Sequence, residues 1–109
     1  MTEETNFKAI CGIATTVLDM PTGSLSLKTR KRAIQVARAS AAYIGMTENN
    51  IHRNVIGKVL NRNRAVTYHY ELKHKKLYAS CIVYRNTFNK IYKAYKDIDG
   101  AKNIFIDND

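Results

Sequence analysis

Apolar side chains recur every three or four residues along most of this chain, and that spacing limits what the chain can fold into. One such stripe consists of Phe7, Ile10, Cys11, Ala14, Val17 and Leu18, and the longest consists of Leu77, Cys81, Tyr84, Phe88, Ile91, Tyr95 and Ile98. A period near 3.6 residues places these side chains on one face of an α-helix. We therefore predict an all-α fold, a compact bundle of five to six helices.

Turn-forming residues separate the first two predicted helices. Pro21 and Gly23 follow the first stripe and interrupt it. The second helix, over residues 33–44, is rich in alanine, which favours helix and lets a neighbouring helix approach closely. Gly45 is predicted to end this helix.

A shorter third helix is predicted between residues 51 and 60. Its N-cap is predicted to be one of three polar residues, Thr47, Asn49 or Asn50. Gly57, within this helix, is predicted to let it lie close to the second helix.

The next segment fits two kinds of secondary structure. The alternating set typical of a strand is Val66, Tyr68, Tyr70 and Leu72, and the set typical of a helix is Val66, His69, Tyr70, Lys73 and Leu77. Periodicity leaves both open.

The last predicted helix covers residues 77–98, about 20 residues with the apolar seam of a coiled coil. Three heptads are more often the cap of a small core, but the seam also offers a face for a homodimer. Residues 1–100 form a single predicted domain. Residues 101–109 form a short acidic tail with a strand-like segment at 104–106.

Positive charge is concentrated in the middle of the chain. The 109 residues contain 18 Lys and Arg and 9 acids, a net charge of +9. Between Lys28 and Lys96 there are 16 basic residues and only two acids, Glu48 and Glu71, a net of +14. A folded domain with this charge repels itself at low salt unless a polyanion neutralises it, and nucleic acid is the commonest such partner. A solvated lysine-rich surface is the alternative.

The chain carries no pattern typical of an enzyme, a metal site or a membrane protein. Cys11 and Cys81 are expected to be buried, reduced thiols, and with His52, His69 and His74 they form no metal-ligand spacing. His52 and His74 are expected at the surface. The N-terminus is polar and acidic, and no apolar run approaches about 18 residues. We expect a cytoplasmic protein without catalytic activity, cofactor, metal, nucleotide or membrane partner.

The turn after the third helix is followed by Arg62, Asn63 and Arg64. Two helices joined by a tight turn, the second opening with polar and basic residues, are typical of a helix-turn-helix. The first turn of a recognition helix lies deepest in the major groove, where Arg contacts guanine and Asn contacts adenine. The unpaired amides at that helix end also favour a phosphate.

Residues 7–77, about two-thirds of the chain, resemble the C-terminal DNA-binding domain of the bacterial chromosomal replication initiator DnaA. The matching residues are Arg38, Tyr43-Ile44, Ile56-Gly57 and the run Arg62-Asn63-Arg64-Ala65-Val66-Thr67-Tyr68-His69, after a one-residue deletion in the turn. The resemblance implies a TrpR/DnaA-like helical fold and assigns helix to the ambiguous segment. No GxxxxGK[ST] sequence occurs, so we expect a freestanding domain without the ATPase of that family.

The resemblance also implies which part of duplex DNA each residue contacts. Arg30 and Arg32, in the basic loop at residues 28–32, would enter the minor groove, and Arg38 and Arg62 would hold phosphate. The major-groove readers would be Asn63, Arg64 and Ala65, which replace Asp-His-Thr of the family pattern and so predict a different base preference. The full predicted DNA-binding set is Lys28, Arg30, Lys31, Arg32, Arg38, Arg62, Asn63, Arg64, Ala65, Thr67, His69 and Lys73.

The sequence also predicts where His69 and the tyrosines lie. His69 is expected behind the recognition helix or on a phosphate. The tyrosines are expected to pack in the core with their hydroxyls at its rim, rather than stack on single-stranded bases: Tyr43, Tyr68, Tyr70, Tyr78, Tyr84, Tyr92 and Tyr95.

The alternative to DNA binding is an interaction module. A helix-turn-helix fold can be reused as a protein–protein adaptor, with the basic surface facing an acidic partner. Replication control, transcription control and DNA packaging all fit the DNA-binding hypothesis, in a phage or mobile element if the abundance of Ile, Lys, Asn and Tyr reflects an A·T-rich genome.

Overall fold

In the computed structural model, which describes the backbone of residues 2–107 and the side chains of residues 2–98, the chain folds into five α-helices. They are α1 (Glu3–Val17), α2 (Arg32–Glu48), α3 (Arg53–Leu60), α4 (Arg64–Ser80) and α5 (Ile82–Asp107), with a 3₁₀ turn, η1 (Ser24–Ser26), before α2. No strand occurs among the described residues. The all-α prediction is confirmed, and the ambiguous segment is the helix α4.

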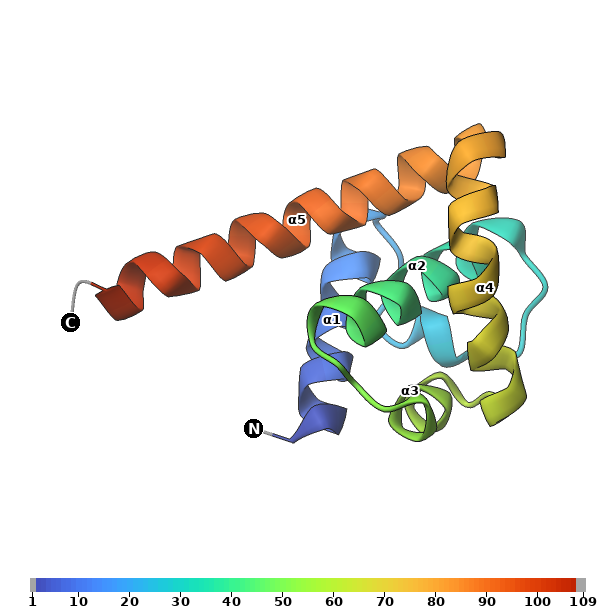
Figure 1. Ribbon diagram of the computed structural model, residues 1–109, viewed down its shortest axis with the longest axis horizontal. Coiled ribbons are helices and arrows are strands. Elements are labelled where there is room, and N and C mark those ends of the chain that lie inside the picture. The colour runs from blue at the N-terminus through green and yellow to red at the C-terminus, as the bar shows by residue number, and fades with distance from the viewer. Residues whose placement is uncertain (1, 108–109) are drawn as a thin grey trace.

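Helix α2 occupies the centre of the bundle, packed against α1, α4 and α5 (Figure 1). Its inner face consists of small side chains with one larger residue, all fully buried: Ala37, Ala41, Ala42 and Ile44. Short side chains let the surrounding helices approach closely, as the alanine-rich sequence predicted. The core is completed by residues of α1, α3 and α5: Phe7, Ile10, Ile56, Leu60, Tyr84 and Ile91.

Gly45 does not end α2, which continues to Glu48. Gly45 is buried against α1, where a Cβ atom at this position would stand 2.8 Å from Cδ1 of Phe7. The prediction of a helix end was therefore wrong, because this glycine accommodates a tertiary contact rather than a turn.

Two glycine substitutions should therefore have opposite effects on stability. Gly12 lies inside α1, and a Cβ atom added to it would meet nothing within 4 Å, so Gly12→Ala should stabilise the protein by about 0.8–1 kcal/mol through helix propensity alone. Gly45→Ala gains the same propensity but crowds the Phe7 ring, so we expect a net loss of about 1 kcal/mol. Urea unfolding followed by circular dichroism measures both. Equal gains would contradict the close contact.

The N-cap of α3 is His52, whose Nδ1 accepts a hydrogen bond from the Asn54 backbone N–H at 3.0 Å. The predicted caps were wrong. Thr47 lies in the last turn of α2, where its hydroxyl donates to the Tyr43 carbonyl, while Asn49 and Asn50 lie in the connection that follows.

The helix predicted to start at Leu77 is interrupted at Cys81. Cys81 has an extended backbone (φ −116°, ψ 107°) that separates α4 from α5. Arg85 then donates to the Tyr78 and Ala79 carbonyls at 2.8 and 3.0 Å, which satisfies two of the last carbonyls of α4. The chain can therefore turn back so that α5 packs across α2 and α1 (Figure 1).

At its other end, α5 continues to Asp107. Residues 104–106 are therefore helical rather than strand-like, and the helix crosses the predicted boundary at residue 100. The tail prediction for residues 108 and 109 lies outside the described residues.

His74, predicted at the surface, is half-buried at the centre of an aromatic cluster that joins α4 to α2 and α5. Its ring stacks on Tyr43 with centroids 3.6 Å apart, and Nδ1 lies 2.6 Å from the Tyr84 hydroxyl. Burial lowers the pKa of His74. Most tyrosines are buried or half-buried as predicted, whereas Tyr68 is exposed.

The two cysteines are free thiols in different settings. Cys11 is half-buried on α1, and burial raises its pKa to about 12. Cys81, predicted on a helix face, instead lies at the junction of α4 and α5.

Candidate nucleic-acid interface

Helices α3 and α4 are joined by a turn of three residues, 61–63. Asn61 has a left-handed backbone (φ 56°), and the Arg62 N–H donates to the Gly57 carbonyl at 2.8 Å. A Cβ atom on Gly57 would stand 2.9 Å from the carbonyl oxygen of Arg62. The role of Gly57 is therefore to admit this turn, not to bring α3 close to α2 as predicted.

Asn63 is the N-cap of α4. Its Oδ1 accepts a hydrogen bond from the Ala65 backbone N–H at 2.8 Å. A two-point contact with adenine needs both Oδ1 and Nδ2. Because the oxygen is already engaged, Asn63 can offer a base only its Nδ2 donor unless the cap breaks.

Two residues of the predicted DNA-binding set are buried. Thr67 has no exposed surface, and its hydroxyl donates to the Arg64 carbonyl at 2.6 Å. Arg38 is 4 % exposed. Burial corrects the prediction that Thr67 contacts DNA, and it gives Arg38 a structural role.

The Leu27 carbonyl oxygen is held by two arginines from different elements. Arg38 donates from Nη2 to Leu27 at 3.0 Å and from Nε to the Leu25 carbonyl at 2.8 Å. Arg62 donates from Nη2 to the same Leu27 oxygen at 2.8 Å. Charge-assisted hydrogen bonds of this kind are stronger than neutral ones. The chain is thus fixed to α2 and to the α3–α4 turn just before the basic loop begins.

The other end of the basic loop is also fixed beside α4. Arg32 donates from Nη2 to Sγ of Cys81 at 3.0 Å, immediately after α4 ends. Residues 28–32 therefore run alongside α4 (Figure 1). Within this loop Lys28, Arg30 and Lys31 are exposed.

A cleft of about 370 Å³ opens between α2 and α4. The polar side chains lining it are Gln35, Arg38, Arg62, His69, Tyr70, Lys73 and Tyr84. Burial lowers the pKa of Arg38, and the charge of Arg62 lowers it further. Two arginines that repel each other, with no carboxylate in the lining, make this cleft a favourable place for an anion.

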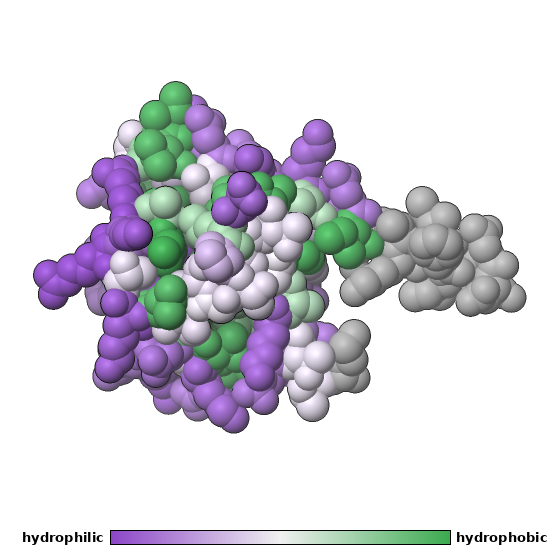
Figure 2. All heavy atoms as spheres, turned by 180° about the vertical axis from the view of Figure 1, so that it is seen from behind, coloured by the Kyte–Doolittle hydropathy of each residue, from purple (hydrophilic) through white to green (hydrophobic). Residues whose placement is uncertain are grey.

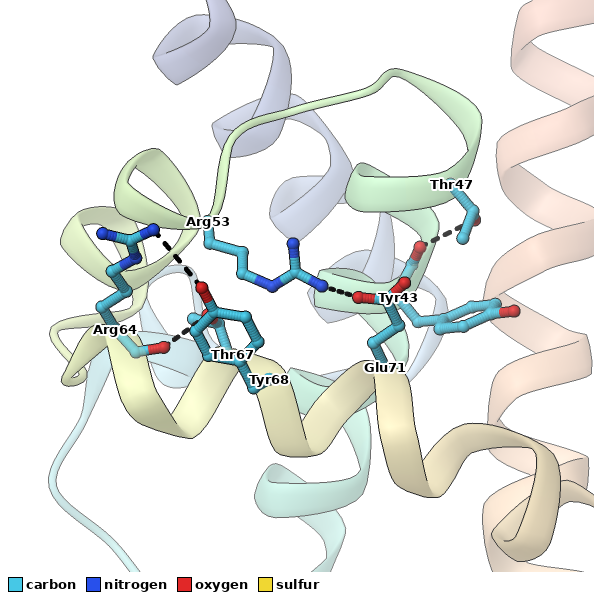
Figure 3. A network of polar contacts seen from close by, with 7 residues as sticks. All are labelled: Tyr43, Thr47, Arg53, Arg64, Thr67, Tyr68 and Glu71. Atoms are coloured by element: carbon cyan, nitrogen blue, oxygen red, sulfur yellow. Dashed lines mark hydrogen bonds and ion pairs between the residues drawn. The ribbon is translucent and has the colours of Figure 1, made fainter.

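The outer face of α4 carries a polar network centred on Tyr68 (Figure 3). The Arg53 guanidinium lies over the Tyr68 ring, 4.4 Å from its centroid, and Arg64 donates to the Tyr68 hydroxyl at 3.3 Å. Arg53 also forms an ion pair with Glu71. The acid on α4 is thereby neutralised, and Arg64 is held at the helix start.

The sequence prediction missed several residues of this face: Arg53, Tyr68, Leu72, Lys75 and Lys76. Those on α4 follow Arg64 at helical spacing, which would have identified them once the segment was assigned to helix. Figure 2, the view of Figure 1 turned by 180°, shows hydrophilic side chains along the edge where α4 and the basic loop lie. Arg62 of the predicted set is half-buried, and the exposed members are Lys28, Arg30, Lys31, Arg32, Asn63, Arg64, Ala65, His69 and Lys73.

Comparisons with models of protein families, with curated proteins and with solved structures found no match. Among the described residues, no three His, Cys, Asp or Glu side chains gather in a way that could hold a metal ion. No helix in the part of the chain that the structure describes is long and apolar enough to cross a membrane.

Proposed function

We propose that this protein binds double-stranded DNA, with α4 in the major groove and the basic loop at residues 28–32 in the adjacent minor groove. The observation that carries the proposal is the double anchoring of the Leu27 carbonyl by Arg38 and Arg62. It holds an exposed basic loop next to a helix that opens with Arg64. A loop and a helix in this relation suit two neighbouring grooves, as expected of a DnaA-like helix-turn-helix domain.

The distribution of carboxylates supports a polyanionic partner. Glu71 pairs with Arg53, and Glu48 pairs with Lys96 while accepting a hydrogen bond from Tyr92. These are the two acids between Lys28 and Lys96. Because Glu48 and Glu71 are already paired, the remaining cations of this stretch have no carboxylate within it to pair with. The phosphates of DNA would supply the missing negative charges.

The contacts divide the proposed roles among the arginines. Arg64 is exposed at the first turn of α4 and is suited to a base edge. Arg30 is exposed, whereas Arg32 donates to Cys81, so Arg30 is the stronger candidate for the minor groove. A phosphate would lie in the cleft near Arg62, His69 and Lys73. Arg38 would contribute there only through Nη1.

A titration of random-sequence duplex at two salt concentrations tests the proposal. Contacts to about five phosphates predict that each doubling of salt weakens binding by roughly 20-fold. The double variant Arg30→Gln, Lys31→Gln should reduce this salt slope. The matched control, Lys90→Gln, Lys93→Gln, removes the same charge from exposed positions on α5 and should change it less.

Fluorescence anisotropy provides the measurement. An absence of duplex binding at ~50 mM salt would reject the proposal and favour a protein–protein adaptor with an acidic partner. Equal losses in the two double variants would reject the assignment of the loop. If the proposal holds, control of replication or transcription on nucleoid DNA in the cytoplasm is the process that such a domain would serve.

A homodimer through α5 is part of the same proposal. Ile98, in the predicted seam, is 42 % exposed, and the C-terminal half of α5 extends past the other helices (Figure 1). Sedimentation of the parent and of Ile98→Lys would test this interface, since a dimer held by the seam should dissociate in the variant.

A further inference from the structure

Leu72 is the most exposed of the large apolar side chains described, at 76 %. It lies in the middle of α4, one turn beyond Tyr68, which is 41 % exposed. Ala65, Tyr68, His69 and Leu72 stand at positions i, i+3, i+4 and i+7 and are all exposed, so they form one outward face of the helix. This is the spacing at which recognition helices present base-contacting residues.

The surroundings of Leu72 are cationic. Arg64, Lys73, Lys75 and Lys76 lie on the same helix, and all four are exposed. An apolar protein surface that covered Leu72 would have to desolvate several of these charges, which is costly without partners. A DNA groove instead offers phosphates along its edges for the cations and contains one kind of apolar group on its floor, the C5-methyl of thymine.

We propose that Leu72 reads thymine by packing against its C5-methyl group in the major groove. The inference rests on the proposed function and specifies it, because the preferred duplex then carries a thymine at a defined place. Leu72 lies eight positions after Arg64, about 12 Å along the helix axis. At 3.4 Å per step, the thymine lies about three to four base pairs from the base that Arg64 contacts.

The network around Tyr68 makes this position reproducible. Arg53, at the start of α3, makes two contacts with α4. Its guanidinium lies over the Tyr68 ring and forms an ion pair with Glu71, so α3 holds the helical turn that comes just before Leu72. Because Tyr68 and Glu71 are held in this way, Leu72 is presented to a partner in one geometry. A contact with a single methyl group requires such a fixed geometry.

Uracil in place of thymine removes only the methyl group, so it isolates the proposed contact. The best duplex from a selection on random sequence would be prepared with thymine or deoxyuridine at each position in turn. At one position we expect the parent protein to bind the deoxyuridine duplex about fourfold more weakly, the effect of one buried methyl. Leu72→Ala should bind both duplexes equally at that position.

A matched control keeps this result specific. Ile82→Ala truncates another exposed apolar residue, 64 % exposed at the start of α5, and should keep the fourfold discrimination. Leu72→Ala changes an exposed side chain and is expected to fold, which circular dichroism verifies.

The outcomes separate the two proposals. If no duplex binds, the proposed function fails and the inference fails with it. If duplex binds but deoxyuridine is tolerated at every position, the inference is overturned while the proposed function stands. A change in sedimentation for Leu72→Ala without any change in thymine preference would also overturn it, and would assign Leu72 to a contact with a second copy of the chain.

Discussion

Arg38→Met should lower the free energy of unfolding by about 2–4 kcal/mol. Arg38 is almost fully buried and donates to the Leu25 and Leu27 carbonyls. Methionine retains much of the apolar stem but donates no hydrogen bond, so the Leu25 oxygen loses this partner while Leu27 keeps the one from Arg62. Hydrogen bonds to a charged donor contribute about 1.5–3 kcal/mol each. Urea unfolding monitored by circular dichroism provides the measurement.

Arg38→Met should also weaken duplex binding, and by more than the loss of one positive charge explains. Without Arg38, the basic loop is attached at its start only through Arg62. Lys90→Met is the matched control, since it removes one positive charge from an exposed position on α5, away from the proposed interface, and should leave stability unchanged within about 0.5 kcal/mol. Equal unfolding free energies for the two variants would show that Arg38 does not anchor the loop.

The features of the fold that follow from local periodicity could be predicted from the sequence. Phe7 and Ile10 on α1, and Tyr84, Phe88 and Ile91 on α5, are buried as their spacing indicates. That signal fails where a contact between distant segments decides the outcome. Nothing near residue 45 in the sequence shows that Phe7 covers this glycine.

The interruption between α4 and α5 was hidden for a related reason. Leu77, Cys81 and Tyr84 continue the apolar spacing through the break, so the pattern looks like one helix. The break is stabilised instead by Arg85, whose donors reach the last carbonyls of α4. Periodicity carries no information about such side-chain contacts with the backbone.

At the candidate site, charge type predicted exposure in the loop, where lysine and arginine are solvated. The same reasoning wrongly predicted an exposed Arg38. This side chain is buried because it donates to carbonyls that lie 11 and 13 residues earlier in the chain. Leu72 and Tyr68 were missed because the segment fitted both a strand and a helix. Which face of α4 meets solvent is decided by its packing on α2 and α3.

Gly57→Ala should destabilise the protein by about 2–3 kcal/mol and weaken duplex binding at the same time. The new Cβ atom would stand 2.9 Å from the carbonyl oxygen of Arg62 and 3.8 Å from Thr67 Cγ2. That oxygen belongs to the backbone of the turn, so relief requires moving the turn. The hydrogen bonds of Arg62, to the Gly57 carbonyl through its N–H and to Leu27 through its side chain, resist this movement.

A displaced turn changes how α4 leaves α3, so the stability loss and the affinity loss from Gly57→Ala should appear together. Asn61→Gly is the control within the same turn. Glycine relieves the left-handed backbone at φ 56° but adds disorder to the unfolded chain, and these effects nearly offset, leaving stability within about 0.5 kcal/mol of the parent. If Gly57→Ala binds duplex as tightly as Asn61→Gly, the orientation of α4 does not depend on this turn, and the link between the α3–α4 geometry and DNA binding is broken.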